Sequence, residues 1–245
     1  MSVRVLRLMK INFFEAEYNY IIKLLIKKRG YLVMPAASSL IEVKVNAIYR
    51  TALQKSTAAL FDSGFFCLSL LISKFIFFNK FSGYKFIKFF LNDNNLKKKK
   101  ILCLDPSTKS AKINYLYLKS KKFIFIKNYV CPNYNIKSIK DVKLLNIINE
   151  FKPEIIISNI GGGVQEILAF YIKKNAHKKT IIICSGAALS FITGEKAKIT
   201  DLADKYYLGW FKRLLFNPRV YYKRVFNSFP LFFLVLREKI NVSYK

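Results

Sequence analysis

The sequence predicts an α/β fold in which a Rossmann-like parallel sheet is flanked by helices and followed by a C-terminal helical appendage. Continuous apolar runs of strand length, such as residues 155–157 and 180–184, suit strands that are buried on both faces. Turn residues follow each run, and a helical segment follows the turn. Strands that alternate with helices at this spacing are typical of a parallel sheet.

The order of the elements follows from these runs and from the breaks between them. The chain opens with a basic, strand-like stretch, and Gly30 ends the first helix. We expect helices at residues 18–28, 36–55, 65–78, 81–91 and 106–121. We expect strands at residues 31–35, 58–61, 101–105, 123–130, 155–157 and 180–184. The helix at residues 65–78 is so apolar that we place it in the core.

Two changes in composition suggest how the chain is divided. The polar run NDNNLKKKK at residues 92–100 is the clearest internal break, and we expect it to link two halves of one core spanning residues 1–200. Residues 201–245 carry aromatic side chains interleaved with Arg and Lys, as in helices that lie in a membrane interface. We therefore expect a basic, aromatic appendage at the C-terminal end.

The charge is strongly one-sided. The chain has 43 Lys and Arg residues against 14 Asp and Glu residues, a net charge of +29. Nucleic acid, an anionic membrane surface and phosphorylated substrates are all partners that such a charge attracts. Lysine is abundant throughout, so much of the excess is expected to be solvated. Arginine is more informative, because four of the eight arginines lie in the last fifth: Arg213, Arg219, Arg224 and Arg237.

Several kinds of site are disfavoured by what the sequence lacks. The four cysteines (Cys67, Cys103, Cys131 and Cys184) lie far apart in apolar contexts, so we read them as buried thiols of a reducing compartment. The single His177 disfavours a histidine metal site or a catalytic triad. No signal peptide is evident, and the best candidate for a membrane span, residues 64–78, is too short and contains Lys74.

Two glycine turns follow predicted strands in the most informative stretch. Gly161, Gly162 and Gly163 follow residues 155–157, with Gln165 and Glu166 at the start of the next helix. Gly186 and Ala187 follow the strand at residues 180–184 in the same way. Ligands of open α/β sheets bind at such positions, although a tight turn without a ligand explains the triplet equally well. The pattern is neither a dinucleotide fingerprint nor a P-loop.

The order of the motifs carries a resemblance to a known family. GGGVQE begins at Gly161, SGAALSFITG at Ser185, LGWFKRL at Leu208, and NPR with a further arginine five residues later at Asn217. Read together, these motifs resemble the WecG/TagA/CpsF family of bacterial glycosyltransferases, over roughly residues 31–238. The resemblance implies transfer of a hexose or N-acetylhexosamine from a UDP-sugar to a lipid-linked sugar at the inner face of the plasma membrane.

The resemblance also assigns roles to individual residues. Asp62 follows an apolar strand and matches the acid that is expected to deprotonate the acceptor hydroxyl. From the residues alone, capping of the following helix is the preferred role for Asp62, and the resemblance reverses that preference. Lys80 stands where the family has an arginine. The glycines Gly161, Gly162, Gly163 and Gly186, with Ala187, Gln165 and Glu166, are expected to hold the donor.

The C-terminal arginines also match positions of the family pattern. Arg213, Arg219 and Arg224 are expected to clamp a diphosphate, because a guanidinium matches phosphate oxygens bidentately. Exposed arginines on a helix packed against the core remain the alternative. No Asp-x-Asp motif occurs, and the resemblance implies none, so we expect activity without a divalent metal or any other cofactor. The partners implied are a UDP-sugar, a lipid-linked acceptor and the membrane surface, with a homo-oligomer left open.

One departure from the family pattern leaves alternatives open. The family has Thr-Pro-Asn-Ala where this chain has Met34, Pro35, Ala36 and Ala37. The loss of two polar groups keeps open a catalytically impaired, membrane-associated relative that still binds UDP-sugar. A basic nucleic-acid-binding protein is the other alternative, although the chain carries no recognisable nucleic-acid motif.

Overall fold

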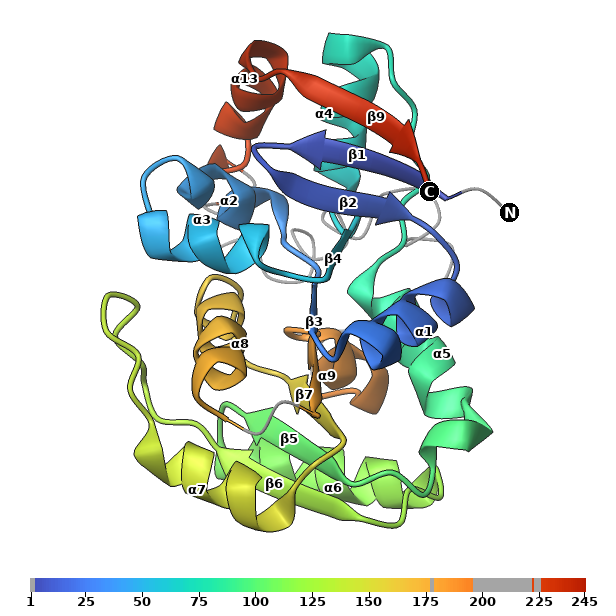
Figure 1. Ribbon diagram of the computed structural model, residues 1–245, viewed down its shortest axis with the longest axis vertical. Helices are drawn as coiled ribbons and strands as arrows, with labels where there is room; N and C mark the ends of the chain where they lie inside the picture. The colour runs from blue at the N-terminus through green and yellow to red at the C-terminus, as the bar shows by residue number, and fades with distance from the viewer. Residues whose placement is uncertain (1–2, 177–178, 196–221, 223–225) are drawn as a thin grey trace.

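The protein is described here by a computed structural model that covers residues 3–176, 179–195, 222 and 226–245. Its strands form one nine-stranded sheet in the order β6-β5-β7-β8-β3-β4-β2-β1-β9 (Figure 1). The strands are β1 (Arg4–Leu8), β2 (Ile11–Glu15), β3 (Tyr31–Val33), β4 (Ala58–Leu60), β5 (Ile101–Asp105), β6 (Ile126–Val130), β7 (Ile155–Ser158), β8 (Ile181–Cys184) and β9 (Ile240–Tyr244). The expected Rossmann-like α/β fold is confirmed.

The pairing divides the sheet into a parallel part and an antiparallel edge. The seven strands from β6 to β2 in this order run parallel to one another, so their carboxyl ends lie along one edge. β1 pairs antiparallel with β2 and with β9, which brings the two ends of the chain together. Residues 240–244 therefore extend the sheet, where the sequence predicted helix.

Helices cover both faces of the sheet (Figure 1). One face packs against α2 (Ala37–Leu40), α3 (Ala47–Gln54), α4 (Gly64–Lys74), α7 (Val142–Phe151), α8 (Val164–Asn175) and α13 (Pro230–Arg237). The other packs against α1 (Tyr18–Lys28), α5 (Gly83–Asn92), α6 (Thr108–Ser120) and α9 (Ala188–Thr193). Successive residues of β5 enter opposite cores, because side chains alternate along a strand.

Two expected helices differ from the prediction. The helix expected at residues 36–55 is broken into α2, a short 3-10 turn (Ile41–Val43) and α3. Asn46 causes the second start, because its side chain accepts the N–H of Tyr49 at 2.9 Å and caps α3. The helix expected at residues 65–78 ends at Lys74, and only one side of it is buried.

Candidate active site

Asp62 lies just beyond the carboxyl end of β4, where the chain turns into α4. Its Oδ1 accepts the N–H of Gly83, the first residue of α5, at 2.7 Å. The N-cap of α4 is Ser63, whose hydroxyl accepts the N–H of Phe66 at 3.2 Å. The alternative role considered for Asp62, capping of α4, is therefore taken by its neighbour. The carboxylate is held at the amino end of α5, where the helix dipole favours negative charge.

Gly83 marks the point where three strand ends meet. A Cβ placed on Gly83 would lie 3.7 Å from Asp62 Oδ1, 3.7 Å from the Ser185 carbonyl oxygen and 3.3 Å from Met34 Sδ. These three residues follow β4, β8 and β3. The predicted acid and the turn that contains Gly186 therefore belong to one region of the molecule.

The glycine triplet occupies the turn between β7 and α8, as predicted. A Cβ on Gly161 or Gly163 would meet no atom within 4 Å, so the turn faces open space. Gly163 has a φ of +90°, a conformation that L side chains rarely adopt. Gly162 is closer to its surroundings, because a Cβ there would lie 3.1 Å from Ser39 Oγ.

Gln165 and Glu166 brace the two glycine turns. Gln165 accepts the N–H of Gly186 at 2.9 Å and donates to Glu166 Oε1 at 3.0 Å. The other carboxylate oxygen of Glu166 accepts the N–H of Gly163 at 2.7 Å. Gly186 has a φ of +58°, and Ala187 then precedes α9. Direct contact of Gln165 and Glu166 with the donor stays a prediction. In the structure, their hydrogen bonds hold the two glycine turns in place.

The strand order sets the length of the site. β7, β8, β3 and β4 are consecutive neighbours, so three strand spacings separate the glycine triplet from Asp62. At about 4.8 Å per spacing this amounts to ~14 Å along the carboxyl edge. A ligand that contacts both ends must therefore be elongated.

The comparison with protein families covers nearly the whole chain. The model of the glycosyl transferase WecG/TagA/CpsF family matches residues 4–244. The chain belongs to this family. WecG/TagA/CpsF proteins are glycosyltransferases of cell-surface polysaccharide synthesis, which use a sugar donor and, in general, a lipid-linked acceptor. A comparison with curated proteins gave no significant match.

Lys80 of this WecG/TagA/CpsF protein lies in the loop between α4 and α5, three residues before Gly83, whose N–H donates to Asp62. The Phe81 N–H donates to the Phe61 carbonyl oxygen at 3.0 Å, which fixes the loop next to the end of β4. Burial raises the pKa of the Cys67 thiol to about 12, and both Lys80 and Asp62 are close enough to influence it. Lys80 also lines a cavity of about 570 Å³ with Tyr18 and other residues of α1 and α5.

Not every predicted residue of the family site can be placed. Arg213, Arg219 and Arg224 lie outside the described residues, so their clamp on a diphosphate stays a prediction. Within the described ranges, no group of three or more His, Cys, Asp or Glu side chains is placed to hold a metal ion. All four cysteines are buried, as expected.

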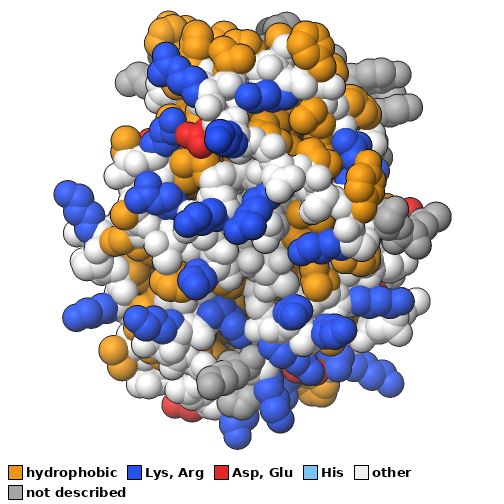
Figure 2. Space-filling view, turned by 45° about the horizontal axis from the view of Figure 1, so that its top comes forward, with side chains coloured by type: hydrophobic (Ala, Val, Ile, Leu, Met, Phe, Trp, Pro, Cys, Tyr) orange, Lys and Arg blue, Asp and Glu red, His pale blue; other side chains and the backbone are white. Residues whose placement is uncertain are grey.

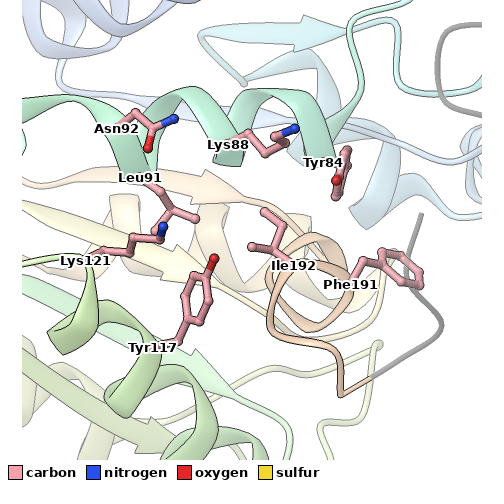
Figure 3. Close-up of a pocket in the computed structure, with 8 residues that line it drawn as sticks. All are labelled: Tyr84, Lys88, Leu91, Asn92, Tyr117, Lys121, Phe191 and Ile192. Atoms are coloured by element: carbon pink, nitrogen blue, oxygen red, sulfur yellow. The ribbon is translucent and has the colours of Figure 1, made fainter. Parts of the chain in front are cut away.

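A cavity that sequence reasoning missed opens between α5, α6 and α9. It measures about 320 Å³, and Figure 3 shows its lining side chains: Tyr84, Lys88, Leu91, Asn92, Tyr117, Lys121, Phe191 and Ile192. Tyr84 directly follows Gly83, so one end of this cavity lies beside the Asp62 region. Two lysines and two tyrosines give it a basic, aromatic character.

A buried polar network was also missed. Asp105 ends β5 with no exposed surface, and its carboxylate accepts N–H groups from Asn114 at 2.6 Å, Asn159 at 2.8 Å and Asn128 at 2.7 Å. Burial raises the pKa of Asp105, although these hydrogen bonds oppose the shift. The chain leaves β5 toward β6 and leaves β7 toward β8, so the network lies at a topological switch point. An acid at the end of an apolar strand, the signal that identified Asp62, also marks Asp105.

Glu166 predicts a pH dependence of stability. Burial raises its pKa from 4.5 to about 6. The folded state then binds more protons than the unfolded state between these values, so stability falls as the pH rises through them. A shift of this size corresponds to about 2 kcal/mol. The test compares the free energy of unfolding of Glu166→Gln with that of the wild type from pH 4 to pH 7. As the pH rises, the difference should shift in favour of the variant by about 2 kcal/mol.

Glu154 supplies the control with the opposite sign. Burial opposes ionisation of Glu154, yet hydrogen bonds from Lys99 and from the Lys100 N–H lower its pKa overall. Its contribution to stability is therefore lost as the pH falls. Glu154→Gln should lose stability relative to the wild type as the pH rises, and the same trend in both variants would contradict the assignment of Glu166.

Proposed function

We propose that this protein transfers a hexose or N-acetylhexosamine from a UDP-sugar to a polyprenyl-diphosphate-linked sugar, with inversion at the anomeric carbon. The observation that carries the proposal is the meeting of Asp62, Met34 and Ser185 around Gly83. It places an acid beside the turn of Gly186, which is expected to help hold the donor. The ~14 Å between the triplet and Asp62 is a span that an extended nucleoside diphosphate sugar can bridge.

The chemistry requires one base and stabilisation of one leaving group. Asp62 takes the proton from the acceptor hydroxyl, whose oxygen attacks the anomeric carbon of the donor. The bond between that carbon and the diphosphate oxygen breaks, and UDP departs with the bonding electrons. Lys80, the cavity lysines and the arginines of the C-terminal segment offset the charge that develops on UDP.

Met34 supports a second candidate, a relative that binds UDP-sugar without turning it over. The Met34 side chain lies where a polar group is usual in the family, with Sδ 3.3 Å from a Cβ placed on Gly83. A thioether there offers only a weak acceptor to a sugar hydroxyl. Binding of UDP-sugar without release of UDP would favour this candidate.

The test combines donor screening with a turnover assay. The UDP-sugar that binds the native state should raise the melting temperature, because a ligand of the folded state stabilises it. UDP release with that donor and a lipid-linked acceptor should persist when a chelator is added. Loss of turnover on chelation would overturn metal independence, and the absence of any UDP-sugar binding would overturn the donor assignment.

The proposed place of action is the inner face of the plasma membrane, as a peripheral protein. Every helix in the described ranges falls short of the length and apolar character needed to span a bilayer. The proposal is supported by the charge of +29 and by the aromatic, basic composition of residues 201–245. The same proposal includes a homo-oligomer. Sedimentation velocity measures the oligomeric state and tests it.

A further inference from the structure

The surface around the ends of α4 and α13 is unusually apolar. On α4, Ile72 is 62% exposed although the helix was expected in the core, and Phe75 just after it is 91% exposed. The outer side of α13 is similar, with Phe233 at 56%. We call these side chains the apex surface, which consists of Leu68, Leu71, Ile72, Phe75, Phe77, Phe229, Phe233 and Leu236.

The two helices form one unit at the end of the molecule. Lys74 Nζ donates to the Leu236 carbonyl oxygen at 2.9 Å, which joins their carboxyl ends. The ring of Phe65 packs edge-on against Phe229, with centroids 5.7 Å apart. In Figure 1 both helices lie at the top of the molecule, and Figure 2 shows hydrophobic side chains gathered there among Lys and Arg.

Phe75 has an unfavourable backbone in addition to its exposure. Its φ of 56° and ψ of 30° place it in the left-handed region, where a bulky side chain is rare. The position suits Gly or Asn far better. An aromatic residue that is strained and almost fully exposed points to a contact with a binding partner.

The charges around the apex surface favour an anionic partner. Neither α4 nor α13 contains an acidic residue, whereas Lys74 and Arg237 lie in their last turns. Two of the nearby acids are paired with cations, because Glu15 pairs with Arg4 at 3.0 Å and Glu238 pairs with Lys44 at 3.0 Å. Exposed apolar side chains next to Lys and Arg are the chemistry that binds an anionic bilayer.

We propose that the apex surface inserts into the interface of an anionic bilayer, with Phe75 and Ile72 penetrating deepest. This inference gives a defined surface to the membrane contact that the proposed function requires, and its test needs no sugar substrate. α4 has 11 residues, so Asp62 at its other end lies about one helix length, ~16 Å, from the insertion point. The acid would then face a sugar carried above the headgroups.

The experiment measures binding to vesicles by co-sedimentation. The probes are vesicles of phosphatidylcholine alone and of phosphatidylcholine with 30% phosphatidylglycerol, a composition chosen at roughly the anionic content that gives a strong surface potential. The wild type should bind the anionic vesicles more tightly. Phe75→Asn should weaken that binding roughly ten- to one-hundred-fold, because a large apolar side chain leaves the interface.

Controls separate insertion from loss of fold and from failure of the proposed activity. Phe75→Asn should melt no lower than the wild type, because Asn tolerates the left-handed conformation. Phe125→Asn removes another half-exposed ring, 49% exposed, and should leave vesicle binding unchanged. Phe125 directly precedes β6, which lies at the opposite end of the molecule from α4 and α13 (Figure 1). A UDP-sugar thermal shift that is the same in wild type and Phe75→Asn keeps the two proposals independent.

Three outcomes would overturn the proposal. Unchanged binding of Phe75→Asn and of Phe75→Asn/Ile72→Ser to anionic vesicles would exclude insertion through this surface. An equal loss with Phe125→Asn would show that any exposed ring suffices. A dimer in sedimentation velocity that dissociates in Phe75→Asn, with vesicle binding intact, would make the apex surface an interface between copies of the chain.

Discussion

Asp62→Asn should reduce turnover by roughly 10²- to 10⁴-fold, the range by which a positioned general base accelerates a reaction. The amide cannot take the proton of the acceptor hydroxyl. Its Oδ1 can still accept the N–H of Gly83, the bond that measures 2.7 Å in the wild type. The start of α5 should therefore stay in place, and the melting temperature and the UDP-sugar thermal shift should change little.

Ser63→Ala is the matched control, one residue further along the chain. Its hydroxyl caps α4 by accepting the N–H of Phe66. Loss of a cap costs about 1 kcal/mol of stability, so this variant should melt lower yet keep its turnover. Near wild-type turnover in Asp62→Asn, or an equal loss in Ser63→Ala, would remove the base assignment.

Asp105→Ala should cost roughly 2–6 kcal/mol in the free energy of unfolding. The fully buried carboxylate accepts hydrogen bonds from the buried amides of Asn114 and Asn159 and from the half-buried amide of Asn128. Each buried donor left without an acceptor costs roughly 1–3 kcal/mol. Urea denaturation of the purified variant measures the loss directly.

Asp93→Ala provides the comparison at a less buried site. Asp93 also accepts three hydrogen bonds, from the Tyr18 hydroxyl and from the backbone and side chain of Asn95. Water can replace its oxygens there, so we expect a loss of about 1 kcal/mol or less. Equal losses in the two variants would show that burial of the Asp105 network contributes little.

Much of the candidate site could be predicted from local patterns. Asp62 and the glycine turns follow apolar strands, and the carboxyl ends of parallel strands share one edge, so their placement on that edge was predictable. The Asp105 network was missed because its partners lie 9, 23 and 54 residues away from Asp105 in the sequence. No local pattern reveals that three distant amides converge on one carboxylate.

The helix at residues 65–78 illustrates a different limit. Its composition indicated a buried helix, yet α4 ends at Lys74 and exposes Ile72 and Phe75. Composition records how apolar a helix is, whereas the number of neighbours that cover it depends on the whole fold. For this reason the helix that was expected in the core forms part of the exposed apex surface.

By itself the sequence determined the fold class, most strand positions and the family, because apolar periodicity, turn residues and motif order are local properties. Only the tertiary structure decided the strand order, the joining of β9 to β1, the bracing of the glycine turns by Gln165 and the exposure of α4. Each of these depends on contacts between segments far apart in the chain. Such contacts are selected by how all the apolar surfaces can be buried together, which no single stretch encodes.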